Sequence, residues 1–224
     1  MSFMKTNTVN ITVDGHTYNS LTDFGLAIEN TNYLGEPVQD DRHRISVPGR
    51  PGLLYLDDTV FGGTVFLSRA IEIKFGGMEE SEDWDGVIST LRNLFEGRLV
   101  KLSFATDPDW YWTGKVVIDD FKHTRSLGTF NFRIPEADPY KHKDHHVELV
   151  STVSGVSVTF ANSVQKVVPT ITTNATITVT QGLKTFTFEA GTHRNPSLVF
   201  SEGNNELVFK NAANVSVDYT EGSL

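Results

Sequence analysis

Apolar residues at every second position predict that most of the chain forms β-strands. β-branched and aromatic side chains occupy these positions, which is typical of strands with one buried face. The longest run precedes residue 76, and two shorter runs follow it. The three runs are Val65, Leu67, Arg69, Ile71, Ile73 and Phe75; Val100, Leu102 and Phe104; and Phe130, Phe132 and Ile134. We expect each run to point to one face of a sheet.

One segment, at about residues 82–96, follows a helical pattern instead. Ser81 can cap its first turn, Glu82 and Asp83 suit the positive end of the helix dipole, and Gly97 stands where a left-handed C-terminal cap is needed. The apolar positions form a single stripe: Trp84, Val87, Ile88, Leu91, Leu94 and Phe95. We predict one amphipathic helix that covers a sheet, in preference to a free partner-binding face.

The composition changes at the segment 141–146, beyond which charge thins and short Thr-, Val-, Ser- and Asn-rich strands take over. We therefore place a boundary between domain 1–144 and domain 145–224. In the second domain, Pro169 marks a strand entry and Gln181-Gly182 a turn. The evenly spaced strands predict a β-sandwich. Their apolar positions are Val156, Val158, Phe160, Ile177, Val179, Phe186, Phe188, Leu207, Phe209, Val215, Val217 and Tyr219.

Charge and cysteine content exclude several classes of function. The net charge of −9 and the pI near 5.2 argue against sequence-specific nucleic-acid binding, which needs clustered Lys and Arg. The absence of cysteine excludes disulfides and thiolate metal sites, and it fits folding in a reducing cytosol. With no signal-peptide pattern and no run of about 20 apolar residues, we expect neither secretion by that route nor membrane insertion.

The segment around His142, Asp144, His145 and His146 is the strongest metal-site candidate, because imidazole and carboxylate bind zinc and related ions. The spacing is poor, since His145 and His146 would diverge on a strand and nothing indicates a helix. A solvated linker is the favoured interpretation. We assign no metal, cofactor or catalytic residue.

Paired acids could serve a glycosidase, but adjacent aspartates rarely stand at the separation that reaction needs. Turn capping is the favoured interpretation of Asp57-Asp58, Asp107 with Asp109, and Asp119-Asp120. Nucleophile-elbow and phosphate-loop motifs are absent, and Gly62-Gly63 and Gly76-Gly77 are typical of turns. The chain is therefore not expected to be an enzyme.

Two further features leave alternatives open. Trp110-Tyr111-Trp112 could stack on sugar rings, although alternation on a strand predicts that at least one ring is core. Arg69 interrupts an apolar strand face, so it either meets a carboxylate or carbonyls when buried, or lies at a subunit interface.

Read together, residues 45–141 resemble the N-terminal domain of the distal tail proteins of siphophages that infect Gram-positive bacteria. The closing residues, from Pro169-Thr170-Ile171 to Leu224, resemble the β-sandwich of the same family. The matching pieces are Ile45 to Gly52, Arg69-Ala70-Ile71, the Trp84 helix before Gly97, Asp107-Pro108 with Tyr111 and Gly114, and Ala137-Asp138-Pro139-Tyr140-Lys141.

This resemblance implies a mainly β protein with a ring-forming N-terminal domain and a galectin-like C-terminal β-sandwich. The family forms a hexameric ring with an open channel at the distal end of the tail tube. Implied partners are the tail tube protein, the tail-tip hub or tail-associated lysin, and in some phages a receptor-binding protein. The implied location is the virion tail tip, after synthesis in the host bacterial cytoplasm.

The segment Tyr33 to Arg44 is a candidate arm for packing on a neighbouring subunit, with a solvated loop as the alternative. Two other functions compete with the structural role. A carbohydrate-binding protein for host cell-wall saccharide would use the sandwich or the Trp110 to Trp112 platform. A glycan hydrolase would need one essential acid among the aspartates and glutamates.

Overall fold

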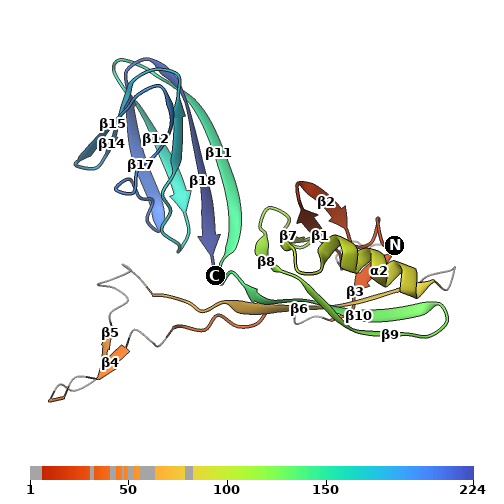
Figure 1. Cartoon of the computed structure of the whole chain (residues 1–224). Helices are drawn as coiled ribbons and strands as arrows, with labels where there is room; N and C mark the ends of the chain where they lie inside the picture. The colour runs from red at the N-terminus through yellow and green to blue at the C-terminus, as the bar shows by residue number, and fades with distance from the viewer. Residues whose placement is uncertain are drawn as a thin grey trace. The chain divides into compact units, whose positions relative to one another are not determined.

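The computed structural model describes residues 7–30, 33–40, 44–46, 48–49, 53–55, 64–78 and 83–224 (Figure 1). The chain divides into two compact units, Met1–Pro139 and Tyr140–Leu224, each with its own hydrophobic core. The boundary expected from composition, between residues 144 and 145, falls inside the strand β11 (Lys141–Ser151). This strand is continuous because it pairs along its whole length with β18 (Ala213–Ser223).

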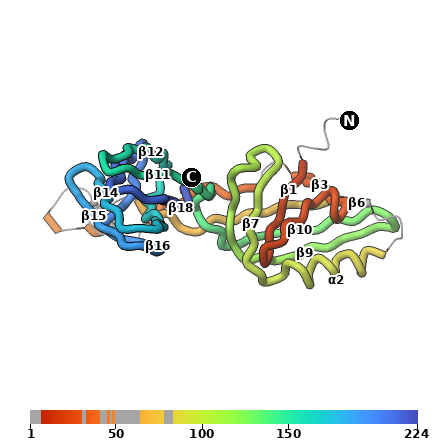
Figure 2. The backbone as a smooth tube through the Cα atoms, turned by 90° about the horizontal axis from the view of Figure 1, so that it is seen from above, coloured from red at the N-terminus to blue at the C-terminus, as the bar shows by residue number. Residues whose placement is uncertain are grey.

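The N-terminal unit contains two four-stranded antiparallel sheets, in the orders β2-β1-β7-β8 and β3-β6-β10-β9. The long strands β9 and β10 run side by side (Figure 2). A separate pair joins β4 (Arg44–Ser46) to β5 (Leu53–Tyr55). The strands are β1 (Val9–Val13), β2 (His16–Asn19), β3 (Leu26–Ile28), β6 (Arg69–Met78), β7 (Leu99–Phe104), β8 (Trp112–Lys115), β9 (Val117–His123) and β10 (Leu127–Ala137).

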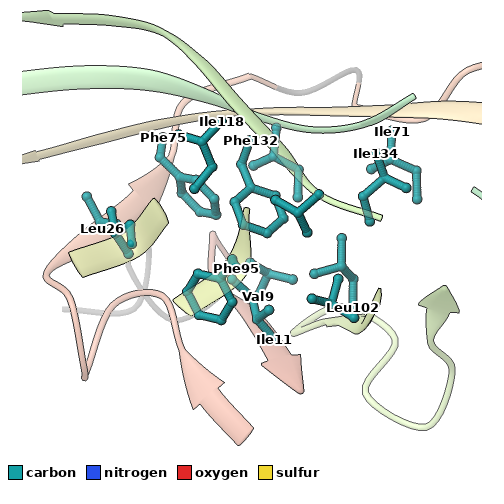
Figure 3. Close-up of a cluster of buried hydrophobic side chains, with 14 of the residues drawn as sticks. Val9, Ile11, Leu26, Ile71, Phe75, Phe95, Leu102, Ile118, Phe132 and Ile134 are labelled. Carbon is teal, nitrogen blue, oxygen red and sulfur yellow. The ribbon is translucent and has the colours of Figure 1, made fainter. Parts of the chain in front are cut away.

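The N-terminal core lies between these two sheets. Figure 3 shows apolar side chains of β6 and β10 facing those of β1 and β7. All three predicted runs contribute buried residues, which confirms the alternation from Arg69 onward. Val65 and Leu67 precede β6, which begins at Arg69, and they do not share its buried face, because Leu67 is 37% exposed.

The predicted helix is confirmed as α2 (Trp84–Phe95), whose buried face is Trp84, Ile88, Leu91 and Phe95. Phe95 packs edge-on against Phe132 of one sheet and Tyr18 of the other, so the helix joins both layers. Its N-cap is Asp83, which accepts a 3.0 Å hydrogen bond from the Gly86 N–H. Gly97 has a φ of 70°, as expected just past a helix end. The proposed cap Ser81 lies outside the described residues.

Gly76 and Gly77 do not form the predicted turn, because both lie within β6. Their small size is used for close packing instead. Gly77 pairs with Gly128 of β10, and a Cβ on Gly128 would come within 2.6 Å of the Trp84 ring. The two glycines therefore make room for the first buried residue of α2. Gly62-Gly63 lie outside the described residues.

The C-terminal unit is the expected β-sandwich, with one sheet in the order β11-β18-β13-β16 and the other in the order β12-β17-β14-β15. Phe160, Phe200, Phe209 and Tyr219 form an aromatic cluster in its core. Pro169 directly precedes a strand, as predicted. The remaining strands are β12 (Val156–Asn162), β13 (Thr170–Thr173), β14 (Ile177–Gln181), β15 (Lys184–Phe188), β16 (Gly191–Arg194) and β17 (Gly203–Lys210).

Candidate functional site

A two-stranded ladder continues from β6 away from the sheet, and we call it the arm: residues 33–40 paired with residues 65–72. Backbone hydrogen bonds of 2.8–2.9 Å join Tyr33 to Glu72, Gly35 to Ala70 and Asp40 to Val65. The predicted candidate arm, Tyr33 to Arg44, is therefore not a free loop over residues 33–40, because its backbone groups are paired within the chain.

Arg69 holds the base of the arm. Its Nε donates a 2.8 Å hydrogen bond to the carbonyl oxygen of Gly35, which also accepts from the terminal Nη2. The guanidinium lies 4.7 Å from the centre of the Trp112 ring, a cation–π arrangement. Burial lowers the pKa of Arg69, yet an arginine keeps its charge in proteins. Of the two alternatives for Arg69, the structure supports a carbonyl partner within the chain.

The arm exposes apolar side chains. The Leu67 N–H donates 2.8 Å to the Val38 carbonyl, so these two residues stand opposite each other. Val38 is 56% exposed and Leu67 is 37% exposed, and Ile45 of β4 is 44% exposed. A narrow ladder cannot bury both of its faces within its own chain, so these residues are available to another surface.

The histidine segment forms strand β11, so the solvated-linker interpretation is wrong. Alternation sends His145 inward, where its Nε2 lies 2.8 Å from the Glu221 carboxylate and its ring stacks on Tyr219. His146 points outward to Asp218, 2.5 Å away, and to Glu148, 3.3 Å away. Within the described residues, no three His, Asp, Glu or Cys side chains gather closely enough to hold a metal ion.

Two groups beside this strand have shifted pKa values. The hydrogen bonds to Asp218 and then Glu148 raise the pKa of His146, because both stabilise the imidazolium. Burial, and secondarily the Glu221 charge, raise the pKa of Tyr219, whose hydroxyl donates 2.8 Å to the Ala161 carbonyl. Tyr219 thus serves as a neutral hydrogen-bond donor in the sandwich core.

The turn-capping interpretation is wrong for Asp119 and Asp120, because both lie within β9. Asp119 forms an ion pair with Arg133, whereas its neighbour Asp120 has a positive φ of 50° and pairs with Lys122 at 2.7 Å. In the 105–111 loop, the Asp107 carbonyl accepts a 3.2 Å hydrogen bond from the Trp110 N–H. Asp57-Asp58 lie outside the described residues.

The aromatic triplet does not form a continuous platform. Trp112 is 5% exposed and belongs to the N-terminal core, as alternation predicted for at least one ring. The Tyr111 ring is covered by the Lys101 ammonium, 4.1 Å from its centre. This arrangement weakens the sugar-platform alternative at these residues.

Together, these features define a class: a two-unit β protein with a ladder-like arm on one unit and a polar outer sheet on the other. No helix within the described ranges has the length and hydropathy of a membrane span. No family model and no curated protein matches the sequence.

A solved structure is similar in fold over nearly the whole chain. It is the crystal structure of SPP1 Dit (gp 19.1), described as a paradigm of the hub adsorption apparatus in phages that infect Gram-positive bacteria. The TM-score is 0.59 and the sequence identity is 15%, with 96% of this chain and 99% of that chain covered. The resemblance to distal tail proteins that the sequence predicted is therefore confirmed in the fold.

Proposed function

We propose that this chain is a structural component of a phage tail, and that it forms a hexameric ring at the distal end of the tail tube. The observation that carries the proposal is the fold shared with SPP1 Dit over nearly the full length of both chains. The ring would join the tube protein to the tail-tip hub and its lysin, with a receptor-binding protein as a further partner, and its channel would pass the genome. Synthesis in the host cytoplasm and location at the virion tail tip follow from this role.

The arm supports an assembly role. A cyclic ring needs a heterologous interface, in which one patch of each subunit meets a different patch of the next. The arm is fixed at its base by Arg69 and carries the exposed pair Val38 and Leu67. We infer that this apolar pair packs on the neighbouring subunit, where it loses contact with water.

The proposed interface between subunits is tested by introducing one negative charge into the apolar pair Val38 and Leu67. Val38→Asp should abolish rings in negative-stain images and reduce the sedimenting species to monomer, because burying an unpaired carboxylate is costly. Val153→Asp is the matched control, since Val153 is a 79% exposed valine of the C-terminal unit. Rings that persist in Val38→Asp as in the control would contradict the arm interface.

A further inference from the structure

The outer face of the sheet β11-β18-β13-β16 contains a cavity of about 590 Å³. This volume lies within the range of about 300–1,000 Å³ that is usual for small-molecule sites. His146, Asp218, Thr170 and Arg194 line it, together with residues 165–168. All of the residues that line the cavity belong to the C-terminal unit.

The floor of the cavity is one row of polar side chains across four strands. His146 of β11 pairs with Asp218 of β18, Asp218 with Thr170 of β13, and Thr170 with Arg194 of β16. Neighbouring strands are about 4.8 Å apart, so the row places donors and acceptors at regular short intervals. Such spacing suits a ligand with several hydroxyl groups.

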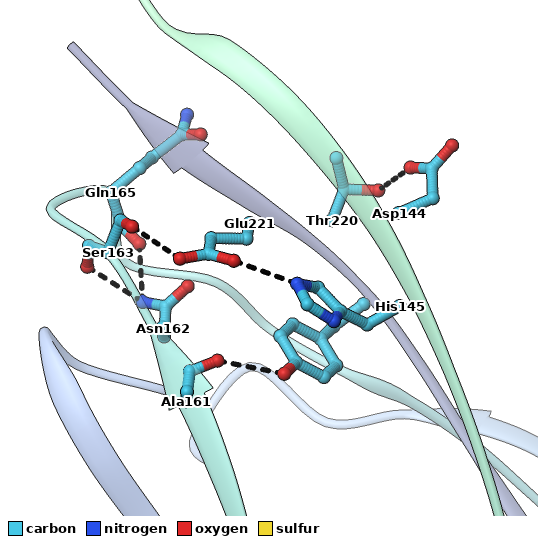
Figure 4. A network of polar contacts seen from close by, with 9 residues as sticks. Asp144, His145, Ala161, Asn162, Ser163, Gln165, Thr220 and Glu221 are labelled. Carbon is cyan, nitrogen blue, oxygen red and sulfur yellow. Dashed lines mark hydrogen bonds and ion pairs between the residues drawn. The ribbon is translucent and has the colours of Figure 1, made fainter. Parts of the chain in front are cut away.

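Beside the cavity, a partly buried polar network holds Ser163 and Gln165 against β18 (Figure 4). Glu221 accepts from the Ser163 hydroxyl and is hydrogen-bonded to His145, while the Gln165 N–H donates 3.1 Å to the Gly222 carbonyl. A Cβ on Gly222 would come within 2.1 Å of the Gln165 side-chain oxygen and 2.8 Å of its Cβ, so these two residues pack closely. These contacts fix the positions of His145 and Gln165, which both line the cavity.

The charges in the cavity favour a neutral ligand. The lining carries the carboxylates of Asp144 and Asp218 beside the cations of Lys166 and Arg194 and the imidazoles of His142, His145 and His146, so it presents both signs of charge. Asp144 already accepts from Thr220 and Asp218 is bonded to His146, whereas Arg194 has no ion-pair partner among the described residues. An anion would meet two carboxylates, and no metal cluster is present within the described part of the chain.

A second cavity, of about 610 Å³, continues along the same face. It is lined by Glu148, Ser216 and Thr172, which lie two residues along their strands from His146, Asp218 and Thr170. Two residues of strand span about 6.7 Å, so the two cavities follow one another along the strands. An elongated ligand can occupy both.

We propose that this outer face binds a neutral oligosaccharide, with Arg194 and Asp218 as the principal hydrogen-bonding groups to one sugar ring. The guanidinium donates to ring hydroxyls and the carboxylate accepts from them. Thr170 adds a hydroxyl between the two. The next sugar lies over Thr172 and Ser216, where hydroxyl groups continue the row.

The test is isothermal titration of the full-length protein with three neutral probes: chitotriose, maltotriose and cellotriose. We expect saturable binding of at least one, unaffected by inorganic phosphate. Arg194→Ala and Asp218→Asn should each weaken that binding at least about tenfold, because each removes a charge-assisted hydrogen bond. The matched control is Lys184→Ala, an exposed residue of β15 on the other sheet.

Absence of binding to all three sugars would overturn the inference, as would displacement of the sugar by phosphate. Full affinity in Arg194→Ala, with the melting temperature unchanged, would move the site elsewhere and contradict the assignment. The inference is independent of the proposed assembly: a protein that forms rings but binds none of the sugars contradicts only the saccharide site.

Discussion

The arm and the outer face of the C-terminal sheet are both antiparallel ladders, yet they expose opposite kinds of side chain. On the arm, Val38 stands opposite Leu67 in solvent. On the outer sheet, the equivalent cross-strand positions carry His146, Asp218 and Arg194. Backbone pairing is satisfied in both, so the side chains decide what each surface can contact. An apolar pair gains free energy by contact with protein, whereas a polar row can be solvated or bind hydroxyl groups.

The largest expected effect is the loss of stability when a buried phenylalanine is removed from the core of either unit. Phe132 is 2% exposed in the N-terminal core and Phe209 is 0% exposed in the C-terminal core. Phe132→Ala and Phe209→Ala should each cost about 3–5 kcal/mol, because each leaves a cavity. Calorimetry should show two transitions, each variant lowering one of them. A single transition that both variants lower equally would contradict independent units.

A smaller effect tests how the arm is attached. Arg69→Leu removes both hydrogen bonds to the Gly35 carbonyl and the contact with Trp112, so the arm should loosen by about 1–3 kcal/mol. Hydrogen exchange at the Gly35 N–H, which donates to Ala70, measures this loosening. Arg194→Leu is the control, since Arg194 is exposed on the C-terminal unit. Unchanged protection of Gly35 in Arg69→Leu would show that the arm needs no such support.

The smallest effect concerns pH at the polar row. The pKa of His146 is raised in the folded protein, so its contribution to stability is complete below the unfolded pKa of about 6.5 and is lost as pH rises through the folded pKa. His146 is exposed, so the change in melting temperature of the C-terminal unit should be small.

NMR titration measures this shift directly. Asp218→Asn should lower the pKa of His146, because Asp218 makes the larger of its two stabilising hydrogen bonds. Thr172→Ala, two residues along β13 from the row, is the control. An unchanged His146 pKa in Asp218→Asn would contradict the assigned partner.

The sequence predicts those elements whose patterns are set by burial alone. The runs ending at Phe75, Phe104 and Ile134 and the helix at Trp84 are clear because each has one buried face. Strand β11 was missed because it carries polar residues on both faces along 141–146: its inward His145 is satisfied by Glu221, a partner 76 positions away. Pairing at that distance leaves no local signal in the sequence.

For the candidate sites, too, the sequence predicts what burial determines and misses partners that are distant in the chain. Alternation predicted that one ring of Trp110-Tyr111-Trp112 is core, and the structure identifies it as Trp112. The sequence left Arg69 with two alternatives because its partner, the Gly35 carbonyl, is a backbone atom that carries no residue signature. The row His146, Asp218, Thr170 and Arg194 depends on the register of four strands, which no local pattern specifies.

Assembly into a closed ring is tested most directly by the mass of the purified full-length protein in solution, measured by light scattering. The chain mass is 24.9 kDa, so we expect six times this value at concentrations in the micromolar range. A monomer at every concentration, with both calorimetric transitions intact, would contradict self-assembly of the folded protein into a ring.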